Sequence, residues 1–291
     1  MEKSMNQKHQ DPNVQAAIDE CLPLIKALGK GRCAVSIGGS RGKRTTDNWS
    51  DIDFRLFCDE IVGASKFTET EAWQVFSQAV DKWREKGIEI DYVWPRTIRD
   101  VDAQLAGWLR GEIRPLPIVW TLWGYHLLTD LTNQIIVDDP NGIIAAWQAK
   151  LTPYPQVLQD AIIKKYMKSL THWRPDYHYR NKVERGDKVF LASISARLVQ
   201  DMMQILFALN KTYYVGDGNN LHYVAEFDIK PDNFAERTEA ILFPEYGNDV
   251  LSKQYDAVVA LIDEVMQLVR EANGGRHVSA MKETLSVVID E

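Results

Sequence analysis

Residues 36–41 read Ser-Ile-Gly-Gly-Ser-Arg, and residues 50–54, after a polar loop, read Ser-Asp-Ile-Asp-Phe. Apolar side chains predict a short strand that ends at the two glycines and a second strand over 52–57. Side chains of a strand alternate between its two faces, so Asp51 and Asp53 share one face, while the apolar residues beside them point into the core. The two stretches therefore predict two strands joined by a loop that carries glycines and acidic groups.

The acidic pair and the glycines before it favour a cation and a phosphate as ligands. Two like charges placed side by side repel each other unless a cation lies between them, and oxygen ligands favour a hard ion such as Mg²⁺. Gly38 and Gly39 have no Cβ where the backbone meets a predicted helix start, so amide groups and the Ser40 hydroxyl can approach a phosphate closely. Arg41 is a candidate to neutralise a triphosphate, and a solvated loop position is an equally good interpretation of it.

A third carboxylate is needed to complete a two-metal site or to accept a proton from an attacking hydroxyl. The predicted third strand, at 88–93, places Glu89 and Asp91 on one face. Asp91 is preferred because apolar residues surround it, and Glu89, nearer the start of the strand, is the reserve. Arg55 shares a face with Asp53, and we interpret it as an ion-pair partner rather than as a catalytic group.

The remaining patterns divide the chain into two parts. Helical spacing and strand-like runs predict helices at 13–28 and 69–86, weaker strands at 124–128 and 134–137, a turn at 138–142, and long helices at 157–173, 187–209 and 249–271. We therefore expect an α/β domain at 1–148, with a small mixed sheet flanked by helices. An all-α helical domain at 149–291 is expected to follow it, after a proline-containing connection.

Composition limits the classes of function. The 291 residues include 34 Lys and Arg against 41 Asp and Glu, a net charge of −7, which disfavours a large nucleic-acid surface. The three cysteines form no C-x-x-C motif, so neither a disulfide framework nor a zinc site is indicated. The N-terminus has no signal-peptide core, and the longest apolar stretch, at 116–128, is too short to span a bilayer. We expect a cytoplasmic protein without a membrane partner.

Gly39 and Ser40, followed after ten residues by Asp51-x-Asp53, resemble the signature of the polymerase-β-type nucleotidyltransferase superfamily. The small-molecule branch, which contains the aminoglycoside and lincosamide nucleotidyltransferases and their bacterial relatives, is the most similar. The likeness extends to the following helix, the third acidic strand and the helical C-terminal part. Residues 206–214, Leu-Phe-Ala-Leu-Asn-Lys-Thr-Tyr-Tyr, resemble a segment of the helical domains of those relatives. The motif-bearing part, residues 36–93, makes up about a fifth of the chain.

The resemblance implies a reaction and roles for the residues. Enzymes of this kind transfer a nucleoside monophosphate from a nucleoside triphosphate to a hydroxyl group and release pyrophosphate. Gly39 and Ser40 would hold the phosphates, Asp51 and Asp53 would hold two Mg²⁺ ions, and Asp91 would bind the catalytic ion or act as base. ATP is the expected donor, and an aminoglycoside, a lincosamide or a sugar is the expected acceptor. Similar chains often carry a lysine after a Tyr-x-Gly segment, whereas residues 215–219 of this chain contain none.

Two alternatives from other functional classes stay open. One is a binding module without turnover, which would sense a nucleotide or pair with a toxin-type partner. The other is a nucleotidyltransferase that modifies a protein or an RNA. Asp51, Asp53 and Asp91 favour catalysis, because a module without chemistry does not need three converging carboxylates. The lack of a concentrated basic stripe disfavours an RNA acceptor.

Overall fold

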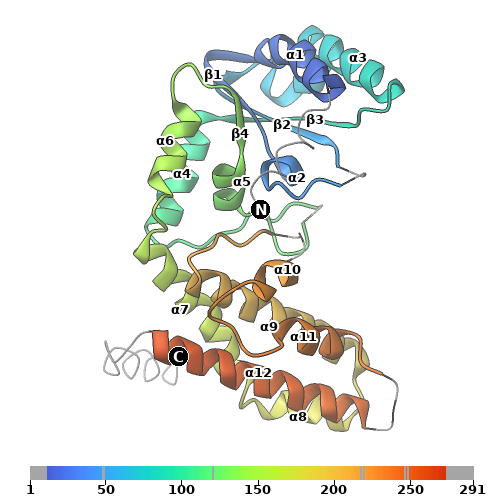
Figure 1. Cartoon of the computed structure of the whole chain (residues 1–291), viewed down its shortest axis with the longest axis vertical. Helices are drawn as coiled ribbons and strands as arrows, with labels where there is room; N and C mark the ends of the chain where they lie inside the picture. Colours follow the sequence, from blue (N-terminus) through green and yellow to red (C-terminus); the bar gives the residue numbers. More distant parts are fainter. Residues whose placement is uncertain are drawn as a thin grey trace. The chain divides into compact units, whose positions relative to one another are not determined.

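Four strands form one mixed sheet in the N-terminal part of the chain (Figure 1). In this computed structural model the described residues are 12–47, 50–119, 121–216, 218, 220–245, 247 and 249–272. The strands are β1 (Gly29–Ile37), β2 (Ile52–Ile61), β3 (Ile90–Thr97) and β4 (Ile135–Asp138), in the order β3-β2-β1-β4. β1 runs antiparallel to β2 and β4, while β2 and β3 are parallel. The expected small mixed sheet is therefore confirmed.

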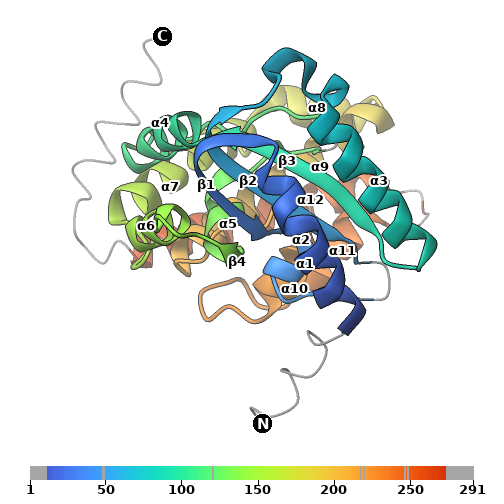
Figure 2. The ribbon, with the colours of Figure 1, turned by 90° about the horizontal axis from the view of Figure 1, so that it is seen from above.

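One face of this sheet is covered by two amphipathic helices. Helices α1 (Pro12–Lys26) and α3 (Glu71–Glu85) lie together on it (Figure 2), and α3 follows the short 3-10 helix η1 (Ala64–Glu69). Thr70 begins α3 by accepting a hydrogen bond from the amide of Trp73. The apolar side chains of β2 that point toward these helices, Ile52, Phe54 and Leu56, are fully buried. Because side chains alternate along a strand, the residues of β2 between these three point to the opposite face of the sheet.

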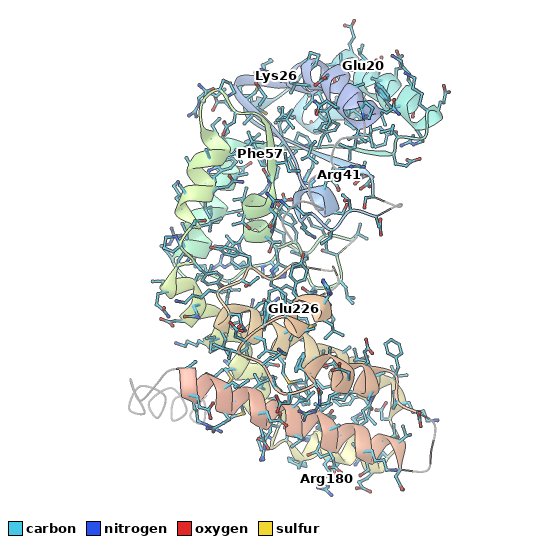
Figure 3. The ribbon with its side chains drawn as sticks, viewed as in Figure 1. Glu20, Lys26, Arg41, Phe57, Arg180 and Glu226 are labelled. Atoms are coloured by element: carbon cyan, nitrogen blue, oxygen red, sulfur yellow. The ribbon has the colours of Figure 1, made fainter. Side chains whose placement is uncertain are left out.

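The opposite face of the sheet packs against helices that come later in the chain. The rings of Phe57 (labelled in Figure 3) and Trp147 meet in a T-shaped arrangement at a centroid distance of 4.9 Å, and both side chains are buried. The Ser36 hydroxyl on β1 donates a hydrogen bond of 2.6 Å to the side chain of Gln134. The other helices of this part are α2 (Gly39–Gly42), α4 (Ile98–Leu109), α5 (Leu127–Asn133) and α6 (Ile143–Lys150). This face is therefore partly polar, unlike the first.

The C-terminal part is helical, as expected. It contains α7 (Gln156–Trp173), α8 (Tyr177–Glu184), α9 (Lys188–Leu209), α10 (Asn220–Ala225), α11 (Phe234–Leu242) and α12 (Val250–Ala272). α9 packs against α7 and α12, and most of its second half is buried. Within the described part of the chain, α9 alone has the length and mean hydropathy of a membrane span, and 67% of that stretch is buried inside the protein. Burial of this kind is typical of a core helix.

The chain divides into two compact units that do not follow the expected boundary after residue 148. One unit comprises Met1–Trp108 and Leu127–Pro153, and the other comprises Leu109–His126 and Tyr154–Glu291. The segment 109–126, which the sequence pattern places in the first domain, thus belongs to the second unit. No change of amino-acid composition marks the two ends of segment 109–126. The later boundary between the units, after Pro153, lies at the prolines that were expected to connect the domains.

The strand predicted at 124–128 is wrong. Tyr125 makes only an isolated bridge to Leu116, and α5 begins at Leu127. Gly124 has a φ of +84°, which interrupts an extended chain, and the next apolar residues are buried at helical spacing. Helices α4 and α6 were not predicted at all, although Val101, Leu105 and Trp108 of α4 are buried at the spacing of a helix face.

The burial of Phe54 predicts a large loss of stability when its ring is removed. We expect Phe54→Ala to lower the free energy of unfolding by about 3–5 kcal/mol, because it leaves a cavity in a fully buried position between the sheet and helices α1 and α3. Val75→Ala, at an exposed position of α3, is the control and should change it by less than about 0.5 kcal/mol. Urea denaturation followed by circular dichroism measures both. Equal effects would contradict this description of the core.

Candidate active site

Three carboxylates converge at the end of the sheet where β2 begins. Asp51, Asp53 and Asp91 each offer one carboxylate oxygen, and these oxygens all lie within 4.8 Å of one another. We call these three residues the carboxylate cluster. Asp53 lies in β2 and Asp51 directly precedes it, so the alternation of a strand turns both away from the apolar core. Asp91 comes from the neighbouring strand β3.

An irregularity in β3 accompanies the approach of Asp91 to the other two carboxylates. Ile52 pairs with Ile90 and Phe54 pairs with Val93, so the single residue Asp53 lies opposite both Asp91 and the following tyrosine. One extra residue on one strand is a β-bulge, which re-aims side chains and is common beside active sites. Tyr92 adopts a left-handed backbone with a φ of +40°, and its ring stacks on Trp73 at 5.4 Å.

The structure separates the two acidic residues that the sequence pattern left open on this strand. Glu89 precedes β3, its side chain is 61% exposed, and it forms an ion pair of 3.2 Å with Arg84. Its backbone carbonyl accepts a hydrogen bond from the amide of Ile52. Glu89 therefore helps to join β3 to β2, while Asp91 is the third member of the carboxylate cluster.

The glycine turn lies directly on the carboxylate of Asp53. Gly39 has a φ of +57°, and a Cβ atom built on it would overlap Oδ2 of Asp53. The amide of Gly38 donates a hydrogen bond of 2.9 Å to the carbonyl of Asp53. Only glycine combines this backbone conformation with such a close approach. The turn and the acidic strand are thus one structural unit, although ten residues separate Ser40 from Asp51 in the sequence.

Two polar residues of the turn have different surroundings. The Ser40 hydroxyl oxygen is buried and has no hydrogen-bond partner among the described residues. A buried hydroxyl in this state fits a site that receives an oxygen-rich ligand. The Arg41 guanidinium (labelled in Figure 3) donates to the carbonyls of Asp51, at 2.7 Å, and Ser50, at 3.1 Å. Arg41 thereby holds the loop that carries the first carboxylate, and contact with a phosphate stays a prediction.

The charges of the site are unbalanced. Burial raises the pKa of Asp53 to about 6; the positive charge of Arg55 opposes this rise, and the neighbouring charges of Asp51 and Asp91 add to it. The Asp53 side chain is only 17% exposed, so little water screens these interactions. An excess of negative charge carried by oxygen ligands alone fits a hard divalent cation such as Mg²⁺.

Arg55 is shared between two carboxylates. Its guanidinium lies 3.7 Å from Asp53 and 3.2 Å from Asp130, a residue of α5. Pairing with Asp53 agrees with the interpretation drawn from the strand pattern. Asp130 was not predicted, because it follows Arg55 by 75 residues and lies between the strands expected at 124–128 and 134–137. No local pattern around Asp130 indicates this contact.

The close approach of Gly39 to Asp53 predicts a large loss of stability when one methyl group is added at Gly39. We expect Gly39→Ala to lower the free energy of unfolding by about 3–5 kcal/mol, since the added Cβ overlaps Asp53 and an alanine disfavours the left-handed backbone. Gly142→Ala is a matched control, because Gly142 has a φ of +64° with nothing within 4 Å of an added Cβ. It should cost only about 1–2 kcal/mol. Similar losses in urea denaturation would refute the overlap at Gly39.

The raised pKa of Asp53 predicts that the acidic site destabilises the cation-free protein above pH 6. Because the folded pKa of about 6 exceeds the ordinary value of 3.8, stability is highest where the group is protonated and falls as the pH rises through 6. Asp53→Asn removes this loss. We expect the variant to be more stable than the wild type by up to about 3 kcal/mol at pH 8 in EDTA, and to lose that advantage below pH 4.

Asp59→Asn is the control for this experiment. Asp59 lies on the same strand, and its hydrogen bonds with Arg32 lower the pKa of its carboxyl group. Its contribution therefore has the opposite sign: it is present at neutral pH and is lost as the pH falls. Thermal unfolding across pH 4–8 compares the two variants. If Asp53→Asn destabilised the protein at pH 8, as Asp59→Asn should, the electrostatic description of the cluster would be wrong.

Comparison with known proteins finds one family. Residues 120–217 match a family model described as a domain of unknown function (DUF4037). The match covers about a third of the chain and includes Asp130, but it begins after the three residues of the carboxylate cluster. No curated protein matches the sequence. The similarity is therefore to a family without an assigned activity, over α5 to α9.

Proposed function

We propose that this protein is a nucleotidyltransferase that transfers a nucleoside monophosphate, AMP from ATP in the first instance, to a hydroxyl group of a small molecule and releases pyrophosphate. The observation that carries the proposal is the carboxylate cluster, whose oxygens lie within 4.8 Å of one another. The glycine turn in contact with it, with the buried Ser40 hydroxyl, supports a role in binding phosphate. The small mixed sheet flanked by helices is compatible with a nucleotidyltransferase-like fold.

Each member of the site has a role in this proposal. Asp51 and Asp53 would hold two Mg²⁺ ions, and Asp91 would be the third ligand of one of them. Bound Mg²⁺ neutralises phosphate charge and lowers the pKa of a hydroxyl group beside it. The backbone of Gly39 and the hydroxyl of Ser40 would orient the triphosphate. Arg41 would act by holding the loop that carries Asp51, through the backbone contacts described above.

The reaction requires one bond to form and one to break. The acceptor's hydroxyl oxygen attacks the α-phosphorus of the triphosphate, and the bond from that phosphorus to the pyrophosphate oxygen breaks. The hydroxyl proton must leave at the same time. In this proposal Asp91 accepts it, and the exposure of its side chain supports this role, whereas Asp53 is largely buried beside Arg55. Positioning and charge neutralisation supply most of the remaining catalysis.

The proposal extends to the substrates and the compartment. An aminoglycoside, a lincosamide or a sugar offers the hydroxyl group that the reaction needs. The net charge of −7 is compatible with a cationic acceptor such as an aminoglycoside. ATP and Mg²⁺ are both available in the cytoplasm, which is the location expected from the sequence.

The test is Mg²⁺-dependent release of pyrophosphate from each of the four nucleoside triphosphates, with a pooled panel of aminoglycosides, lincosamides and simple sugars. We expect release that depends on one acceptor. Asp53→Asn should lower its rate by at least about 100-fold. Glu89→Gln, directly before the neighbouring strand, is the matched control and should retain activity, because Glu89 pairs with Arg84 outside the cluster.

The outcomes distinguish the proposal from its rivals. Activity in Asp53→Asn close to that of the wild type would show that the site is misassigned. Nucleotide binding without pyrophosphate release would favour a sensing module, or an acceptor that is a protein or an RNA. Absence of nucleotide binding would refute a nucleotidyltransferase.

A further inference from the structure

A row of polar contacts crosses the sheet face opposite the apolar core and ends at the carboxylate cluster. The Ser36 hydroxyl on β1 donates to Gln134 at 2.6 Å, and the Gln134 amide donates to Asp130 at 3.3 Å. Asp130 in turn accepts a hydrogen bond of 3.2 Å from Nε of Arg55, which neighbours Asp53. This row of polar contacts therefore connects Ser36 of β1 to Asp53 through Asp130 of α5.

The members of this row are withdrawn from water. Ser36 is fully buried and Gln134 is 6% exposed. The side chains of Asp130 and Arg55 are 9% and 13% exposed. Charges in such surroundings interact strongly, and losing one partner leaves the other buried without compensation. Asp130 and Arg55 are thus a strongly interacting pair rather than a surface ion pair of small effect.

Arg55 is held more closely by Asp130 than by Asp53. It donates a hydrogen bond to Asp130, whereas its nearest approach to Asp53, at 3.7 Å, is longer than a hydrogen bond. The backbone leaves room for this arrangement at Gly38. A Cβ atom there would lie 2.8 Å from Oδ1 of Asp130 and 3.1 Å from Nη2 of Arg55. A side chain at residue 38 would push the pair out of place.

Arg55 is a cation tethered beside a carboxylate that has to bind a cation from solution. If its guanidinium turned fully onto Asp53, it would neutralise that carboxylate and compete with a divalent ion. The hydrogen bond to Asp130, supported by Gln134, draws the guanidinium to the side instead. The charge of Asp130 also offsets the charge of Arg55, so the cluster keeps its attraction for a cation.

We infer that Asp130 is a positioning residue, which holds the Arg55 guanidinium away from Asp53 and thereby keeps the carboxylate cluster open to a divalent cation. The inference rests on the proposed function in one respect, that the cluster binds a divalent cation. It predicts opposite effects for the two partners of one ion pair. Loss of Asp130 should weaken cation binding, and loss of Arg55 should strengthen it.

Mn²⁺ binding to the full chain without nucleotide, followed by electron paramagnetic resonance of the free ion, tests the inference. We expect Asp130→Asn to weaken Mn²⁺ binding about tenfold or more, and Arg55→Gln to tighten it several-fold. In the Arg55→Gln background, adding Asp130→Asn should weaken binding much less than it does in the wild type, because the tethered competitor is gone. Asp59→Asn, on the same strand and paired with Arg32, should leave binding unchanged.

A merely structural role of the pair gives a different result. Both single substitutions would then loosen the site and weaken Mn²⁺ binding together, which would overturn the inference. Binding by Asp130→Asn equal to that of the wild type, or no binding by the wild type, would overturn it as well. Should Asp130→Asn fail to fold by circular dichroism, comparing Arg55→Gln with the double variant decides. A large further loss there would show that Asp130 does not act through Arg55.

The experiment separates this inference from the proposed function. Mn²⁺ binding uses no nucleotide and no acceptor, so the expected pattern can appear in a protein that transfers nothing. In that case the positioning role stands and the nucleotidyltransferase reaction fails. Pyrophosphate release combined with equal Mn²⁺ binding by the wild type and Asp130→Asn would instead support the reaction and overturn the positioning role.

Discussion

Repulsion among three carboxylates is the constraint on which the first unit depends. One carboxylate oxygen from each of Asp51, Asp53 and Asp91 lies within 4.8 Å of the other two, and Asp53 is largely buried. Arg55 neutralises only part of this charge, because it also pairs with Asp130. Burial raises the pKa of Asp53 to about 6, and the neighbouring charges of Asp51 and Asp91 add to this rise. A fold selected for stability alone would place apolar or paired residues there, so the site bears a cost that a bound cation would relieve.

Two departures from regular structure in this part of the chain lie at this constraint. The bulge in β3 occurs opposite Asp53, and the left-handed Tyr92 lies within it. The left-handed Gly39 touches the same carboxylate from the other side. The core side chains of β2 meanwhile keep regular alternation and full burial. One face of the strand thus supplies stability, while the backbone around the other face is adjusted to bring acidic groups together.

The sequence predicts this site as far as local geometry determines it. Alternation along one strand is enough to place Asp51 and Asp53 together and away from the core. The same rule puts Glu89 and Asp91 on one face and cannot choose between them, since the bulge at Tyr92 and the ion pair of Glu89 with Arg84 make the difference. Both features depend on tertiary packing, which the alternation of side chains along a strand does not determine. The same limit applies to the fold. The long periodic helices and the first strands were predicted from local patterns, whereas helices α4 and α6 were not, and residues 124–128 were wrongly predicted to form a strand.

Asp130 shows that the contacts of the site extend beyond its sequence motif. The motif-bearing part of the chain ends at residue 93, yet the residue that pairs with Arg55 lies in α5, after the chain has left the first unit at Trp108 and returned at Leu127. Asp130 lies three residues after that return, in the first turn of α5. The segment similar to the domain of unknown function begins within 109–126, which belongs to the second unit, and includes Asp130. The charge balance of the carboxylate cluster therefore depends on two stretches that sequence motifs treat as separate, because Arg55 pairs with Asp53 of one and with Asp130 of the other.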